Sequence, residues 1–82
     1  MKDADIRVAA VATLQSIAPE VETDKLRPDR PLRKQVDLDS MDWLNFLIGL
    51  HEKLGVDIPE ADYARLVTLD DVVAYIANAT GN

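Results

Sequence analysis

The chain has 82 residues, which is enough for one hydrophobic core but not for two, so a single domain over residues 1–82 is expected. It has no cysteine, which excludes disulfide bonds and thiolate metal sites, and no apolar run approaches the roughly 20 residues that cross a bilayer. The formal net charge of −6 disfavours nucleic acid and acidic membranes as partners, and the acidic first residues do not fit a secretory signal, so a cytoplasmic protein without membrane insertion is expected.

A first amphipathic helix is predicted over residues 3–17, because apolar side chains recur there at the spacing of one helix face. The residues on this face are Ile6, Ala10, Leu14 and Ile17. Residues 19–38 contain three prolines and no sustained periodicity, which predicts a long loop. A loop of this length in a compact domain either covers the core or serves a function. Its residues available to cover the core are Val21, Leu26, Leu32, Val36 and Leu38.

A second helix is predicted to begin at Ser40 and to end at Leu54 and Gly55. Asp39 is its expected N-cap, because a short acceptor side chain satisfies an otherwise unpaired amide of the first turn. Gly49 weakens the middle of this helix, which predicts close packing against another backbone at that point. The residues expected to fill the helix interior are Leu44, Leu47, Ile48 and Leu50.

The last third of the chain predicts two more helices. Residues 56–59 are expected to form an extended connector, and residues 60–66 a short helix of about two turns. Thr68 and Asp71 have the spacing of a capping box, which predicts the start of a last helix. The predicted fold is therefore all-α: a four-helix bundle of three longer helices and one short helix, with a long loop between helices 1 and 2.

Residues 37–42 place a hydroxyl group at the junction between this loop and the second helix. Ser40 should be exposed there, and the free amides of a helix start would favour a phosphodiester attached to it. Asp37, Asp39 and Asp42 oppose that field and are more easily explained as contacts for a basic partner. The tripeptide taken alone indicates only a helix start, because short motifs match by chance.

Several further elements agree with this motif in order and spacing from about residue 37 to residue 77. They are Asp39-Ser40-Met41-Asp42, then Leu44, Phe46 and Leu50, then Val56-Asp57-Ile58-Pro59, then Leu66-Val67-Thr68-Leu69, and finally Val72, Tyr75 and Ile76. Together they resemble the acyl carrier protein family. The resemblance implies that Ser40 receives 4'-phosphopantetheine from coenzyme A through a magnesium-dependent phosphopantetheinyl transferase.

The resemblance also implies a monomeric carrier and not an enzyme. The thiol of the prosthetic group would hold acyl groups as thioesters, which is consistent with a chain that lacks cysteine. Partners would be acyl-ligating, acyltransferase or synthase enzymes of fatty-acid, lipid or polyketide-type biosynthesis. Alternatives are an aminoacyl or peptidyl carrier, and an acidic helical interaction module without a prosthetic group. No resident metal is expected.

Two groups of site residues follow from the resemblance. Partner recognition is assigned to Asp37, Asp39, Met41, Asp42, Leu44 and Asn45. The acyl pocket is assigned to Trp43, Phe46, Leu50, Tyr63 and Leu66. Asp37, Met41 and Asn45 depart from the usual glycine, leucine and glutamate, which favours a specialised member of the family. Trp43 either lies exposed near the arm, closes the pocket or anchors the core, and Tyr63 is expected to narrow the cavity.

Charged residues outside this motif are less informative. His51 and Lys53 stand where the family is commonly acidic, which again indicates a specialised carrier. Arg27, Arg30, Arg33 and Lys34 form a basic run that would contact a partner or the phosphate of coenzyme A, although such runs are more often solvated loops. A serine hydrolase is excluded, because His51 would lie about 16 Å from Ser40 along one helix.

Overall fold

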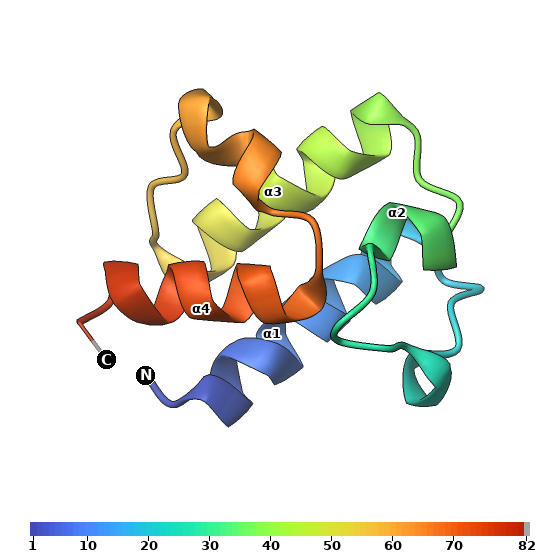
Figure 1. Ribbon diagram of the computed structural model, residues 1–82, viewed down its shortest axis with the longest axis horizontal. Coiled ribbons are helices and arrows are strands. Elements are labelled where there is room, and N and C mark those ends of the chain that lie inside the picture. Colours follow the sequence, from blue (N-terminus) through green and yellow to red (C-terminus); the bar gives the residue numbers. More distant parts are fainter. Residues whose placement is uncertain (82) are drawn as a thin grey trace.

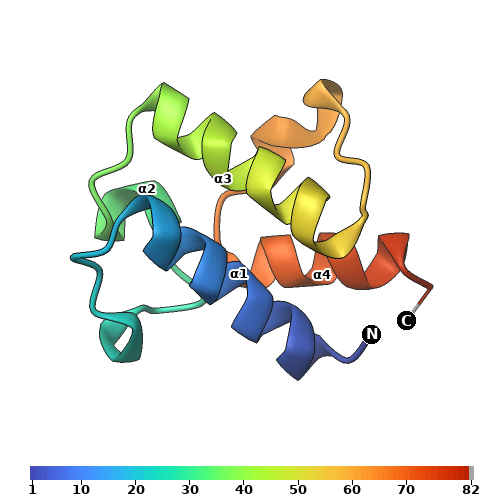
Figure 2. The same ribbon diagram turned by 180° about the vertical axis from the view of Figure 1, so that it is seen from behind.

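The computed structural model describes residues 1–81, and these form helices joined by loops without a strand. In chain order the elements are α1 (Asp3–Ile17), the 3-10 helix η1 (Thr23–Lys25), α2 (Leu32–Gln35), α3 (Ser40–Leu54), the 3-10 helix η2 (Glu60–Arg65) and α4 (Leu69–Ala79). Helix α1 packs against both α3 and α4 (Figures 1 and 2). The predicted all-α bundle of three long helices and one short one is confirmed. No helix in residues 1–81 has the length and apolarity needed to span a membrane.

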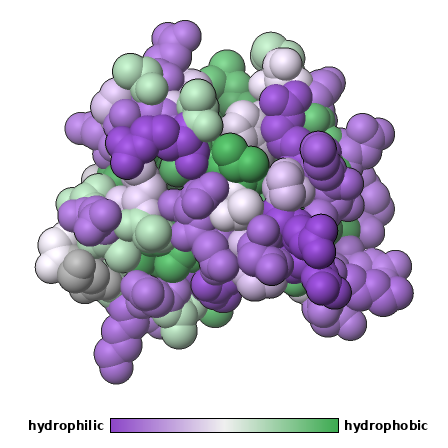
Figure 3. Space-filling view, viewed as in Figure 1, coloured by the Kyte–Doolittle hydropathy of each residue, from purple (hydrophilic) through white to green (hydrophobic). Residues whose placement is uncertain are grey.

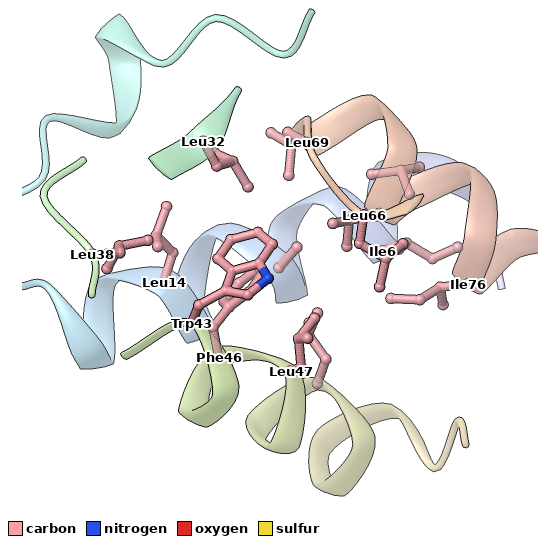
Figure 4. Packing of buried hydrophobic residues seen from close by; sticks show 14 of the residues in the cluster. Ile6, Leu14, Leu32, Leu38, Trp43, Phe46, Leu47, Leu66, Leu69 and Ile76 are labelled. Carbon is pink, nitrogen blue, oxygen red and sulfur yellow. The ribbon is translucent and has the colours of Figure 1, made fainter. Parts of the chain in front are cut away.

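A single core lies between the long helices and the long loop. Leu32 of α2 is fully buried and Leu38 nearly so, which confirms that the loop covers the core. Figure 4 shows core side chains turned toward one another from α1, α2, α3 and α4. Those it labels on these helices are Ile6, Leu14, Leu32, Trp43, Phe46, Leu47, Leu69 and Ile76.

The long loop is more ordered than its sequence predicts. Its backbone is held by Gln35, whose amide group donates to the carbonyls of Arg27 (2.8 Å) and Arg30 (3.0 Å) and accepts from the Arg27 amide (2.6 Å). The Leu32 amide also donates to the carbonyl of Val67 at 2.9 Å, which joins α2 to the segment before α4. Helices as short as η1 and α2 do not contain enough residues to show a hydrophobic periodicity. The sequence therefore could not predict these helices or the hydrogen bonds that hold them.

Helix α3 begins and ends where predicted. The Asp39 carboxylate accepts from the Asp42 amide at 2.8 Å, and Gly55 ends the helix with a left-handed φ of 66°. The expectation that Ile48 fills the interior is wrong, because its side chain is 42% exposed. Each residue advances about 100° around a helix, so Ile48 turns away from the buried face to which Leu47 belongs.

The close packing predicted at Gly49 is confirmed, although the neighbour is a side chain and not a backbone. A Cβ atom on Gly49 would lie 2.8 Å from Cγ2 of Thr13. Thr13 is buried in α1, and its hydroxyl donates to the Ala9 carbonyl at 2.8 Å, so the methyl group has little freedom to move. Glycine at this position therefore lets α1 and α3 approach each other.

Gly49→Ala is expected to destabilise the protein by about 1–3 kcal/mol, as overpacked cores do, although alanine is the better helix former. Thr13→Ser removes the clashing methyl group and keeps the hydroxyl. In that background Gly49→Ala should cost less or become stabilising. Chemical denaturation of the two single variants and the double variant measures this coupling, and additive effects would show that Thr13 is not the obstacle.

The capping box at the start of α4 is confirmed. The Thr68 hydroxyl accepts from the Asp71 amide at 3.0 Å, and the Asp71 carboxylate accepts from the amides of Thr68 (3.0 Å) and Val67 (3.3 Å). The hydrogen bond from the Thr68 amide is the main cause that lowers the pKa of Asp71, and partial burial opposes it. The folded state therefore favours the ionised carboxylate.

This lowered pKa predicts a pH-dependent contribution to stability. The Asp71 carboxylate should stabilise the fold above its unfolded pKa of about 3.9, and that contribution should be lost as the pH falls through the folded pKa. The difference in free energy of unfolding between wild type and Asp71→Asn should therefore be larger at neutral pH than in strong acid. Denaturant titrations at several pH values measure it, and a constant difference would contradict the capping role of the charge.

Candidate functional site

Ser40 is the first residue of α3, and its side chain is exposed. The backbone around it is well held, because Leu38 is buried and the Asp39 carbonyl accepts from the Trp43 amide at 3.0 Å. The Ser40 hydroxyl makes no hydrogen bond with any residue in the described part of the chain. The cap is supplied by Asp39, so the serine hydroxyl is free to react.

No base is hydrogen-bonded to the Ser40 hydroxyl within residues 1–81. His51 lies eleven residues further along α3, and its Nδ1 is 2.9 Å from the Val56 carbonyl and 3.5 Å from the Asp57 carboxylate. A serine that attacks a substrate needs a base within hydrogen-bond reach. An exposed, unpaired hydroxyl without such a base suits a residue that another enzyme modifies.

The surroundings of Ser40 fit an attached phosphodiester. The first-turn amides of α3 give this end of the helix a partial positive charge. Arg33 also lies nearby, since its Nε donates to the carbonyl of Leu38 at 3.3 Å, only two residues before Ser40. The carboxylates of Asp37 and Asp39 oppose this positive field but face solvent, where water screens them.

The residues assigned to partner recognition surround the start of α3. Met41 is 64% exposed, Asn45 is exposed and Leu44 is half-buried. Ile48, which was expected in the interior, lies on this exposed side of the helix. Met41, Asn45 and Ile48 are four and three residues apart, and this spacing could have indicated that they share one face. Figure 3 shows the molecule from the same side as Figure 1. Hydrophilic residues cover most of this face, and apolar residues form small patches.

Three of the five residues assigned to the acyl pocket line one cavity of about 200 Å³, here called the first cavity. Its lining residues are Pro31, Arg33, Trp43, Tyr63, Ala64, Leu66 and Val67. Phe46 and Leu50 do not line it, because both are fully buried in the core. Trp43 is only 9% exposed, which excludes the exposed position considered for it, and its ring centroid lies 5.2 Å from that of Phe46.

A second cavity, of about 340 Å³, lies further along α3. It is lined by Leu47, Ile48, His51, Asp57, Ile58, Pro59 and Tyr63. The sequence did not indicate this cavity, because it forms only where the connector before η2 folds back over α3. Tyr63 of η2 lines both cavities.

The basic run of the long loop is exposed at every position. Arg33 contacts the Leu38 carbonyl, and no ion pair within residues 1–81 involves Arg27, Arg30, Arg33 or Lys34. This matches the solvated loop considered for these residues and leaves their side chains accessible.

Comparison with known proteins agrees with this geometry. Residues 9–76 match the family model described as "Phosphopantetheine attachment site". The chain is 32% identical to an acyl carrier protein of Campylobacter hominis, over 95% of this chain and 92% of that protein. It is 35% identical to an acyl carrier protein of Acidothermus cellulolyticus, over 73% of this chain and 71% of that protein.

A specialised carrier is also among the similar proteins. The meromycolate extension acyl carrier protein of Mycobacterium tuberculosis is 32% identical over 84% of this chain, which spans 60% of that longer protein. Both the family model and the Campylobacter relative cover most of the chain. The chain therefore belongs to the family of acyl carrier proteins, which bear 4'-phosphopantetheine.

Proposed function

We propose that this acyl carrier protein bears its 4'-phosphopantetheine on Ser40. The observation that supports this most directly is the exposed hydroxyl at the start of α3, which has no hydrogen-bond partner in residues 1–81. The only other serine, Ser16, donates its hydroxyl to the Thr13 carbonyl at 2.7 Å within α1. Ser40 is thus the serine that a transferase can reach without breaking an existing contact.

The prosthetic group supplies a thiol that holds acyl groups as thioesters, and the chain itself has no cysteine for this chemistry. The chain's own part is to present Ser40 on a fixed helix end and to offer the surface around it to partner enzymes. We propose that it is a carrier and not a catalyst, because the Ser40 hydroxyl makes no hydrogen bond to a base within residues 1–81, and His51 is engaged with the Val56 carbonyl.

The proposed partners are a phosphopantetheinyl transferase and the acyl-ligating, acyltransferase or synthase enzymes that load and unload the arm. Asp37, Asp39 and Asp42 surround Ser40 with negative charge, which would steer basic surfaces of such enzymes toward it. Met41 and the half-buried Leu44 add an apolar contact. We further propose that the protein is a single-domain monomer that acts in the cytoplasm.

The first cavity is the proposed shelter for the start of the acyl chain. Trp43 lies one turn after Ser40 on α3, and with Leu66 and Tyr63 it gives the cavity a largely apolar lining. Apolar lining of this kind removes the hydrocarbon from water. Arg33 also lines this cavity. Its hydrogen bond to the Leu38 carbonyl places it at the end of the cavity near the proposed attachment point, Ser40.

The experiment that tests the proposal is intact-mass spectrometry. Incubation with coenzyme A, magnesium and a broad-specificity phosphopantetheinyl transferase should add the mass of one phosphopantetheinyl group. A chain that stays unmodified with several such transferases would instead support the acidic interaction module. The intact mass of the protein from its own cell would show the cargo and separate acyl from aminoacyl groups.

A further inference from the structure

We infer that Tyr63 sets the length of the acyl chain that the protein shelters, by closing the first cavity toward the second. The inference rests on the proposed function, in which the chain enters beside Trp43. Tyr63 lines both cavities, and it comes from η2, which runs beside α3 (Figure 1). Tyr63 is therefore the residue shared by the two cavities, and an acyl chain that extends from one into the other would meet it.

The order of the cavities along α3 follows from the helix geometry. With a rise of about 1.5 Å per residue, Trp43 lies roughly 4.5 Å from Ser40 along the axis and Ile48 roughly 12 Å. Trp43 lines the first cavity, and Ile48 lines the second. The first cavity thus lies closer to Ser40 along α3 than the second cavity does, and Tyr63 lines both.

The cavity volumes convert into a chain length. A methylene group takes about as much space as a water molecule in the liquid, ~30 Å³. The first cavity, of about 200 Å³, then holds roughly six or seven carbons. The second, of about 340 Å³, would hold roughly eleven more. An acyl chain longer than the first cavity must displace Tyr63 or lie in water.

Tyr63 is held by packing and not by a polar contact. The side chain is partly buried against the core, and its hydroxyl has no hydrogen-bond partner within residues 1–81. The anchor of η2 is its neighbour Asp62, which accepts a 2.6 Å hydrogen bond from the Tyr75 hydroxyl of α4. That bond is the main cause that raises the pKa of Tyr75, so the hydroxyl stays protonated and remains a donor.

This division of roles makes Tyr63 a suitable position for substitution. Truncating its ring leaves no buried hydrogen-bonding group without a partner, and the Tyr75–Asp62 bond still holds η2 to α4. Tyr63→Ala would join the two cavities into one continuous groove. Tyr63→Phe keeps the ring and removes only the hydroxyl, so it is the matched control. Tyr63→Leu removes less volume and serves if the alanine variant does not fold.

The test begins with holo protein whose modification has been verified by mass, which separates this inference from the proposed function. Wild type and variants are then loaded with saturated acyl chains of increasing length. The readouts are the midpoint of thermal unfolding relative to the holo form and the fluorescence of Trp43, the only tryptophan. Circular dichroism verifies that each variant folds.

In wild type and Tyr63→Phe, the midpoint should rise with each carbon up to roughly six or seven and then level off. In Tyr63→Ala the rise should continue for up to roughly eleven further carbons, and Tyr63→Leu should lie between. Trp43 emission should change at the shortest chains in all of them. The inference is wrong if wild type shows no levelling, or if the folded alanine or leucine variant levels at the same length as wild type.

Discussion

Ser40→Ala is expected to abolish the addition of phosphopantetheine completely, while Ser16→Ala leaves it unchanged. The transferase reaction needs a hydroxyl that can reach the active site of another enzyme, and alanine has none. Ser16 is the matched control, because it is the only other serine and is engaged with the Thr13 carbonyl. Intact-mass spectrometry after incubation with coenzyme A, magnesium and transferase measures both variants.

The loss in Ser40→Ala should not come from unfolding. Ser40 is exposed, Asp39 and not Ser40 caps α3, and alanine is the best helix former. Its free energy of unfolding should therefore stay within about 0.5 kcal/mol of wild type. A Ser40→Ala protein that folds and still gains the group would place the attachment on another residue and would remove the basis of the proposed function.

Ile76→Ala is expected to lower the free energy of unfolding by about 2–5 kcal/mol. Ile76 is fully buried on α4, where its side chain meets the core formed with α1 and α3. A domain of this size has a total stability of only about 4–12 kcal/mol, so this one substitution would remove a large share of it. Chemical denaturation followed by circular dichroism measures the change.

Two further variants test whether the loss of stability comes from the empty space that Ile76→Ala leaves in the core. Ile76→Val removes one methylene group and should cost about 0.5–1.5 kcal/mol. Val8→Ala removes apolar atoms from a side chain that is 69% exposed on α1, and it should change stability by no more than about 0.5 kcal/mol. Equal denaturation midpoints for Ile76→Ala and wild type would contradict the packing of α4 in the core.

The prediction of partner contacts depended on which residues of α3 could be recognised as exposed from the sequence. Met41 and Asn45, which the sequence assigns to partner recognition, are exposed, whereas the prediction that Ile48 lies inside rested on its apolar side chain. Apolar residues are often exposed on small proteins, so hydrophobicity alone does not decide burial. The periodicity set by Trp43, Phe46 and Leu50 would have been the better criterion.

The sequence by itself determined the features that depend on residues three or four apart. The Asp39 cap, the start of α3 at Ser40 and the capping box of Thr68 and Asp71 are local, because each joins a side chain to a backbone amide within one helix turn. The motif around Ser40 is local in the same sense. Its resemblance to a family added the attachment of phosphopantetheine, which helix geometry alone does not indicate.

Only the tertiary structure decided which residues meet across the bundle. The contact of Gly49 with Thr13 joins two helices, and Tyr63 lines two cavities because η2 and α3 both contribute to their walls. Such contacts depend on packing between segments far apart in the chain, and no local pattern specifies them. For that reason the sequence predicted an acyl pocket, while only the structure showed which of the assigned residues line one cavity.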